Sequence, residues 1–295
     1  MKRVLVLVTI AATVAAALTI VGASGAGGSE GTTQLTGTNG APMIRTLGHH
    51  TEGTFGGLPT IALNWSGYAK EAAPNTKFDY VSSEFTQPAV NCSSGQKFVN
   101  TSNWVGLDGF ENDTVEQDGT AAYCAGPGNH TAKYYAWIEL FPLPEVIAFG
   151  VTPGDVISAV VRSTDAGRFT LTVSDLTSGK SKSQSANGPK DQRTSAEWII
   201  ERPAYCNNSE TKCFITPLAN FGTTEMTENV AGLQGKAPVG LGSMPNASQI
   251  FMIQTTNDGG FYSLVNVSPV DPAANAFGVQ WLHAGKSVPI TLGPS

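Results

Sequence analysis

The chain is predicted to be all-β: an antiparallel β-sandwich of two packed sheets, of the concanavalin-like or jelly-roll type, with a concave groove. Short β-branched and aromatic runs alternate with turns rich in Gly and Pro along most of the chain. No ten-residue stretch has the apolar period of an amphipathic helix, and no internal repeat is evident. Strands joined by short turns therefore account for the whole body of the chain.

The strands are expected between residues 78 and 282, and the turns between them carry Gly-Pro-Gly, Pro-Gly-Asp, Asn-Gly-Pro and Asp-Gly-Gly. The predicted strands are Phe78–Phe85, Phe98–Leu107, Thr114–Tyr123, Lys133–Phe141, Asp155–Arg162, Arg168–Asp175, Ala196–Glu201, Gln249–Gln254, Phe261–Val267 and Ala276–Leu282.

One of these strands, in the run Ser195–Glu201, places two acids on one face. Side chains alternate along a strand, so Glu197 and Glu201 point to one side with Ile199, while Trp198 points to the other. Two acids on an otherwise apolar face are costly unless that face is wet, paired or functional.

Two further strands repeat this pattern. Tyr135, Trp137 and Glu139 share one face of their strand, and Trp104 and Asp108 share one face of another, with aliphatic residues opposite in both cases. For a single strand, an ordinary solvent-facing surface would explain the pattern. Three strands together favour a half-wet groove that holds an extended polymer, with the aliphatic faces forming the dry layer between the sheets.

The N-terminus has the order of a secretory signal peptide. Lys2 and Arg3 precede the uncharged apolar run Val4–Val21, which is followed by small residues that end near Ala26. An uncleaved membrane anchor is the alternative, but the run is at the lower limit of length for a membrane span. We therefore expect residues 1–26 to be removed and the protein to be secreted, with no membrane association afterwards.

Residues 27–60 are rich in Gly, Thr and Ser without any period, which predicts a flexible propeptide or N-terminal arm. His49 and His50 lie there without a nearby Cys or third His, so no metal site is expected. Residues 61–295 are expected to form a single β-sandwich domain.

The chain has a net charge of −6 and only 14% charged residues, well below the usual ~25%. Removing the signal peptide with Lys2 and Arg3 takes the net charge to −8. No basic patch is visible, which argues against nucleic acid as a partner. A surface rich in uncharged polar residues suits an acidic medium, and we expect a monomer.

Four cysteines in an exported chain predict two disulfides. Three connectivities are possible, but a bridge between Cys206 and Cys213 closes the shortest loop, which leaves Cys92 to pair with Cys124. A zinc site is disfavoured because no C-x₂-C spacing occurs.

The sequence excludes several catalytic classes. Only four histidines occur, and the chain has no G-x-S-x-G, HExxH, P-loop or dinucleotide-binding motif. No metal or other cofactor is therefore expected. The remaining chemistry is that of carboxylates and an amide, and the candidates are Asp108, Glu139, Glu197, Glu201 and Gln117.

Six blocks of the sequence resemble, in order, the glutamic peptidases, also called eqolisins. The resemblance covers roughly Asn64 to Phe221, and the short loop between Cys206 and Cys213 is similar as well. The blocks are Asn64-Trp65-Ser66-Gly67-Tyr68, Trp104-Val105-Gly106-Leu107-Asp108-Gly109, Val115-Glu116-Gln117-Asp118-Gly119, Ala136-Trp137-Ile138-Glu139-Leu140-Phe141-Pro142, Pro153-Gly154-Asp155 and Ala196-Glu197-Trp198-Ile199-Ile200-Glu201.

The resemblance implies an acid endopeptidase that acts on proteins or peptides through a Gln/Glu dyad. By motif, the dyad is Gln117 and Glu201, not Glu197. The resemblance differs at Leu140, where an aromatic residue is usual, and at the Cys92–Cys124 pairing. Supporting and substrate-binding roles in the groove fall to Trp65, Trp104, Asp108, Trp137 and Glu139.

Two other functions fit part of the pattern. Glu139 and Glu201 could act as the carboxylate pair of a glycoside hydrolase, with Trp137 and Tyr135 as sugar platforms. Alternatively, the groove could only bind carbohydrate or peptide, as a lectin-like module. In a glycosidase Gln117 would be dispensable, and in a lectin both glutamates would be.

Overall fold

The computed structural model describes residues 36–38, 59–164, 167–188, 190, 192–206 and 213–290. The predicted signal peptide lies outside these residues, as do His49 and His50. Of the predicted propeptide or arm, the structure describes the backbone of Thr36–Thr38, which forms a short strand, and the residues from position 59 onward. Within the described part, no helix combines the length and apolar character that crossing a membrane requires.

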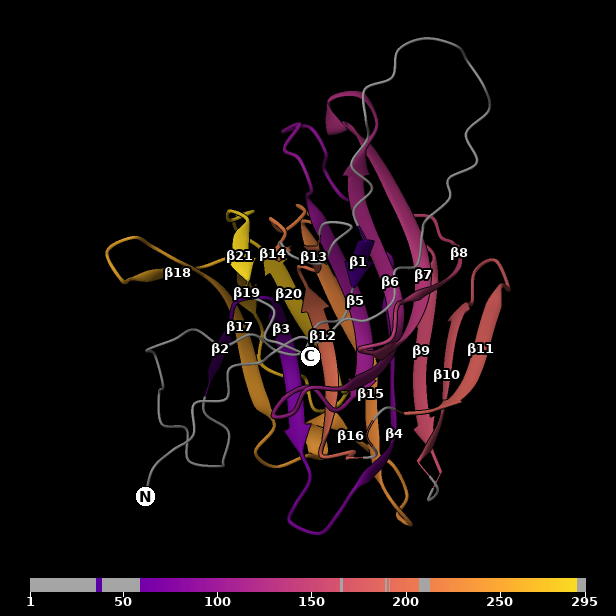
Figure 1. Ribbon diagram of the computed structural model, residues 1–295. Coiled ribbons are helices and arrows are strands. Elements are labelled where there is room, and N and C mark those ends of the chain that lie inside the picture. The colour runs from indigo at the N-terminus through magenta and orange to yellow at the C-terminus, as the bar shows by residue number, and fades with distance from the viewer. Residues whose placement is uncertain are drawn as a thin grey trace.

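Two large sheets and one small sheet make up the fold (Figure 1). The nine-stranded sheet has, in order, β18 (Phe261–Ser263), β17 (Ser248–Thr255), β3 (Trp65–Glu71), β12 (Ser195–Glu201), β5 (Asn100–Leu107), β6 (Val115–Ala125), β7 (Thr131–Phe141) and β8 (Val146–Gly150), with β2 (Thr60–Ala62) beside β17. The eight-stranded sheet has β11 (Ser181–Asn187), β10 (Arg168–Asp175), β9 (Val156–Ser163), β4 (Phe78–Thr86), β15 (Thr223–Leu233), β20 (Phe277–Trp281) and β19 (Val265–Val267), with β16 (Val239–Gly240) beside β15. The four-stranded sheet has β1 (Thr36–Thr38), β13 (Ala204–Cys206), β14 (Cys213–Ile215) and β21 (Val288–Ile290).

The two large sheets pack as a β-sandwich, which confirms the predicted fold class. Aliphatic and aromatic side chains from both sheets form the main core between them, as the alternating pattern predicted. Within the described residues, the helical elements are two short 3₁₀ turns, Pro127–Asn129 and Leu241–Ser243. Buried members of the main core include Phe85, Val105, Leu107, Ile138, Val161, Leu171, Trp198 and Ile200.

Most predicted strands are present, but the run Phe261–Val267 is divided. Its first part, β18, pairs with β17 in the nine-stranded sheet, whereas β19 pairs with β20 in the eight-stranded sheet. The chain passes from one sheet to the other at Leu264, so a single strand cannot form there. The predicted strands did not include β1, β2, β3, β8, β11, β13, β14, β15, β16 or β21.

Strand β11 shows why such strands escape a search for alternating apolar residues. Its sequence from Ser181 to Asn187 is almost entirely polar, and it lies at an edge of the sheet. Hydroxyl pairs with β10 accompany the backbone ladder, such as Thr172 Oγ1 with Ser183 Oγ at 2.9 Å. Cross-strand partners therefore define this strand, and its own sequence does not.

A second apolar cluster lies on the opposite face of the nine-stranded sheet from the main core. The small sheet packs against this face, since Ala204 of β13 belongs to the cluster and Ile290 of β21 contacts it. The other members are Ala62, Trp65, Ala69, Trp104, Phe110, Val115, Ala121, Trp137, Phe141, Ile199 and Ile250, with Tyr135 packed against them.

Arg202, which follows β12, is a buried cation that joins three distant segments. Its Nη2 donates to the backbone oxygen of Ile253, and its Nη1 to that of Lys286, at 3.2 and 3.3 Å. Its Nε donates to the backbone oxygen of Leu63. Burial lowers the pKa of Arg202 to about 10, so the guanidinium stays charged in acid and at neutral pH.

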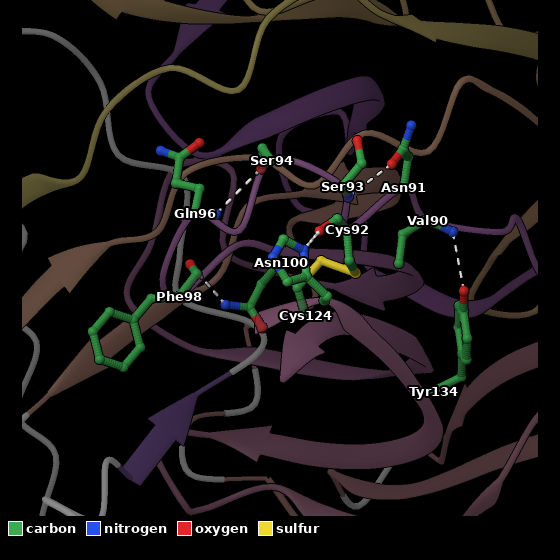
Figure 2. Close-up of a disulfide and its surroundings, with 11 residues drawn as sticks. Val90, Asn91, Cys92, Ser93, Ser94, Gln96, Phe98, Asn100, Cys124 and Tyr134 are labelled. Carbon is green, nitrogen blue, oxygen red and sulfur yellow. Dashed lines mark hydrogen bonds between the residues drawn. A yellow bond between two sulfur atoms is a disulfide. The ribbon is translucent and has the colours of Figure 1, made fainter. Parts of the chain in front are cut away.

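The predicted bridge between Cys92 and Cys124 is present (Figure 2). It joins the segment before β5 to the end of β6, and the ring of His130 contacts the backbone oxygen of Cys92 through Nδ1 at 2.9 Å. Cys213 is also disulfide-bonded, and it lies opposite Cys206 in the β13–β14 ladder. The side chain of Cys206 lies outside the described residues, so its bridge to Cys213 remains a prediction.

Candidate active site

The candidate site lies on the face of the nine-stranded sheet that carries the second apolar cluster. Strands β3, β12, β5, β6 and β7 lie side by side there (Figure 1). Their register places Glu197 opposite Gly106, Gly106 opposite Gln117, and Gln117 opposite Glu139. Paired residues share a face, so Glu197 and Glu139 point to the same side, and Gln117 points there with them.

Glu201 lies at the end of β12, fully buried. Trp104 donates from Nε1 to Oε2 at 2.9 Å, and Asn64 donates from Nδ2 to Oε1 at 3.2 Å. Burial raises the pKa of Glu201 well above its ordinary value, the two N–H donors oppose this rise, and the charge of Glu139 adds to it. The carboxylate is therefore dry, but each of its oxygens is hydrogen-bonded.

Gln117 is also buried, and its amide is held by a second acid. Its Nε2 donates to Oε2 of Glu139 at 2.9 Å, from β6 to β7. An amide has two N–H groups and a carbonyl oxygen, so fixing Nε2 against Glu139 sets the direction of the oxygen. Glu139 thus contacts Gln117 directly and influences Glu201 electrostatically.

Trp104 connects the surroundings of Gln117 and Glu201. While its Nε1 reaches Glu201, its ring covers Gly106: a Cβ added at Gly106 would lie 2.9 Å from Trp104 Cζ3 and 3.2 Å from Gln117 Cβ. A Cβ at Gly119 would lie 2.7 Å from Cβ of Trp104. The two glycines therefore leave room for Trp104, whose ring lies beside Gly106, the residue opposite Gln117 in the ladder.

Trp65 and Trp137, the other two tryptophans predicted to line the groove, pack around Trp104 and the strands beside it. The ring of Trp65 meets that of Trp104 edge-on, with centroids 4.9 Å apart. Trp137 donates from Nε1 to the hydroxyl of Ser102 at 3.1 Å, and Ser102 in turn donates to the backbone oxygen of Thr120. Both tryptophans therefore pack and orient the centre of the face.

The carboxylate of Asp108 is hydrogen-bonded to the chain that leads into β12. Its carboxylate accepts from the backbone N–H groups of Arg193 and Thr194, at 2.6 and 2.7 Å, and from Nδ2 of Asn112. Burial raises its pKa in spite of these hydrogen bonds. Asp108 therefore fastens the chain that leads into β12.

Glu197 is as buried as Glu201 but lies among other acids. Burial raises its pKa well above the ordinary value; the nearby hydroxyl of Ser195 opposes the rise without forming a hydrogen bond in the structure, and the charges of Asp108, Glu116 and Glu71 increase it. An acid in such surroundings holds its proton firmly.

The prediction that this face is half-wet is wrong for the described structure. Trp104, Trp137, Gln117 and Glu201 all have an exposed fraction of 0%. The second apolar cluster covers them, and Tyr135 alone of the predicted outward aromatics is partly exposed. The physical reason is that large aromatic side chains bury more favourably against each other than against water.

The sequence reasoning did not assign a role to Asn64. It stands at the start of the first block that resembles the glutamic peptidases, but no periodicity connects it with Glu201, 137 residues away. A buried amide that faces an acid could only be found from the sheet order, which brings β3 beside β12.

The remaining histidines lie apart from this cluster. His130 contacts the backbone oxygen of Cys92, and the ring of His283 packs edge-on against Tyr262. Among the described residues, no group of three or more His, Cys, Asp or Glu side chains is arranged to hold a metal ion.

Fold and site together define a β-sandwich protein with a carboxylate–amide cluster on one face of its larger sheet. Residues 63–272 match the Peptidase A4 family, and the chain belongs to this family. The resemblance to the glutamic peptidases is thereby confirmed.

Several known proteins are similar to this chain. Scytalidopepsin B of Scytalidium lignicola is 32% identical over 168 residues, which are 55% of this chain and 60% of the relative. Aspergillopepsin-2 of Aspergillus niger is 28% identical over 199 residues, 60% of this chain and 66% of the relative. The chain thus matches less than two thirds of the length of each relative.

The crystal structure of Scytalido-glutamic peptidase with a peptide-based transition state analog superposes with a TM-score of 0.61 at 25% identity, covering 75% of this chain and 98% of that one. The eqolisin SCP-B, in complex with the tripeptide Ala-Ile-His, superposes with a TM-score of 0.59 at 24% identity, with the same coverage. The latter likeness supports the fold.

Proposed function

We propose that the chain is a secreted acid endopeptidase in which Glu201 is the general base and Gln117 orients water and stabilises the oxyanion. The observation that carries the proposal is that Glu139 links the two members of the proposed dyad: it accepts a hydrogen bond from Gln117, and its charge acts on the buried carboxyl of Glu201. Membership of the Peptidase A4 family and the relatives named above support a peptidase.

The reaction needs a base for water, a donor for the developing oxyanion and an acid for the leaving amine. Ionised Glu201 takes a proton from water, and the water oxygen attacks the carbonyl carbon of the peptide. As the C–N bond breaks, the protonated Glu201 returns this proton to the leaving nitrogen. Gln117 stays neutral throughout, and its amide can accept from the water and donate to the oxyanion.

Only the ionised form of Glu201 can act as the base, so activity falls as pH drops below its pKa. The N–H donors from Trp104 and Asn64 favour this ionised form and counter part of the rise that burial gives to the pKa of Glu201. The upper limb of the pH profile comes either from another acid of the cluster or from loss of the fold.

The burial of the cluster has a consequence for substrate entry. Gln117 and Glu201 are closed off from solvent in the described structure, so a peptide reaches them only when part of the cover moves. Protein or peptide substrates then bind along the face that carries Trp65, Trp104 and Trp137.

The test is hydrolysis of denatured casein by the secreted chain between acid and neutral pH, with the chain length followed by mass spectrometry to record any N-terminal processing. We expect cleavage at acid pH that declines toward neutrality and resists pepstatin, chelators, and serine and cysteine reagents. Inhibition by a chelator or a serine reagent, or no cleavage at any pH, would contradict the proposal. Polysaccharide hydrolysis that survives Gln117→Ala would instead indicate a glycosidase.

A further inference from the structure

Asn64 is the second hydrogen-bond donor to the proposed base. Its Nδ2 donates to Oε1 of Glu201 at 3.2 Å, whereas Trp104 occupies the other oxygen. Asn64 is fully buried, and its backbone oxygen accepts from the N–H of Arg202 at 3.0 Å. The main chain and side chain of Asn64 thus contact two consecutive residues, and the backbone contact holds Asn64 beside Glu201.

The hydrogen bond from Asn64 acts on the carboxylate of Glu201, whose other hydrogen-bond donors are neutral. The paired strands present Ser102, Trp65 and Trp104 to Glu201, and none of these titrates in acid. The charged groups nearby are Glu139 on β7 and Arg202, whose guanidinium is engaged with backbone oxygens and the amide of Gln254. Neutral donors from Trp104, Asn64 and Trp65 therefore oppose the effect of desolvation on the carboxylate.

We propose that Asn64 is a positioning residue for the reaction: its amide fixes the orientation of the Glu201 carboxylate and favours its ionised form. The inference rests on the proposed function, because it concerns the same base. It adds a requirement that the Gln117/Glu201 dyad does not contain, namely a neutral amide at position 64. Asn64 does not act on the substrate itself but through Glu201.

The test is the pH profile of kcat and KM for a peptide substrate in wild type, Asn64→Ala and Asn64→Asp. In Asn64→Ala the acid limb should move up by about one pH unit, which is the effect of losing one hydrogen bond to a charged group. Asn64→Asp keeps the shape of the side chain but places a second carboxyl beside Glu201, so its limb should move further up. In both variants kcat should change while KM stays within about twofold, because Asn64 acts through Glu201 and not on the substrate.

Asn103→Ala is the matched control. Asn103 is a buried asparagine that precedes Trp104 on β5, and its Nδ2 donates to Thr224 Oγ1 at 3.0 Å on the other side of the sheet. This substitution should lower the thermal midpoint and leave the acid limb in place. Near-UV circular dichroism of each variant establishes that the protein compared is folded.

An acid limb that coincides with wild type in either folded Asn64 variant would overturn the inference. If Asn64→Ala does not fold, the isosteric Asn64→Asp decides alone, since at low pH its neutral carboxyl fills the same space. Failure of the proposed function would be recognised separately, because wild type itself would then show no acid peptidase activity.

Discussion

The two ends of strand β12 carry glutamates that are equally buried and differently surrounded. Glu201 has an N–H donor on each oxygen, from Trp104 and Asn64. Glu197, four residues earlier on the same face, has no hydrogen-bond partner for either carboxylate oxygen among the described residues, and three other acids lie nearby. Burial alone thus does not decide which acid can ionise; the partners of the carboxylate do.

This difference distinguishes an acid that is suited to act as a base from an acid that is suited to stay protonated. At Glu201, the donors stabilise the charge and offset part of the rise in pKa that burial causes. At Glu197, the charges of Asp108 and Glu116 oppose ionisation further, so its proton is retained over a wider pH range. The same strand therefore presents one acid suited to take a proton and another suited to remain neutral.

The largest effect is expected from removing the dyad. Glu201→Gln and Gln117→Ala should each reduce turnover by about 10² or more, as loss of a general base or an oxyanion donor does. Turnover of a chromogenic peptide at the optimum pH, with the fold checked by circular dichroism, measures this. Near-wild-type turnover in either variant would exclude that residue from the mechanism.

A smaller effect, with a defined sign, is expected from Glu139→Gln. The negative charge of Glu139 raises the pKa of Glu201, so the neutral replacement should lower this pKa and move the acid limb of the profile to lower pH. Turnover should fall about tenfold, because Gln117 loses an ionised acceptor at Nε2. An acid limb that moves up would show that Glu139 does not act on Glu201 in this way.

The smallest effect on turnover is expected from Glu197→Gln, which should retain far more activity than Glu201→Gln. Its larger effect should be on stability. A raised pKa in the folded state means that the folded protein holds the proton of Glu197 more tightly than the unfolded chain does, so stability falls as pH rises from the ordinary value toward the folded one.

Glutamine does not ionise, so Glu197→Gln should unfold at a higher temperature than wild type near neutral pH, with a gain of about 1–3 kcal/mol. The gain should vanish in strong acid, where Glu197 is protonated in both states. Thermal melts at three or four pH values measure it. A gain of equal size at every pH would mean that ionisation of Glu197 is not the cause.

The sequence predicted to which side of a sheet a side chain points, but not what packs against that side. Strand alternation correctly assigned Trp104, Trp137 and Glu139 to one side, because that depends only on neighbouring residues. Whether that side is wet depends on what packs against it, and the small sheet with Ala204 and Ile290 comes from distant parts of the chain. Local pattern cannot reveal such long-range packing.

The hydrogen-bond partners of buried polar side chains could not be predicted from the sequence either. The hydrogen bond of Gln117 to Glu139 follows from strand register, and that of Asn64 to Glu201 from sheet order. Neither the register nor the sheet order can be deduced from the sequence of one strand. Asp108 was expected in the groove on alternation, but the turn after it directs its carboxylate to the chain before β12 instead.

Arg202 shows how a cross-link can be made indifferent to acid. An ordinary ion pair opens in a strongly acidic medium, because its carboxylate takes up a proton and loses its charge. The named acceptors of Arg202 are the backbone oxygens of Leu63, Ile253 and Lys286 and the amide oxygen of Gln254, and none of these groups titrates. A cross-link of this kind does not weaken as pH falls from neutral to strongly acid, so the segments next to Glu201 stay joined across that range.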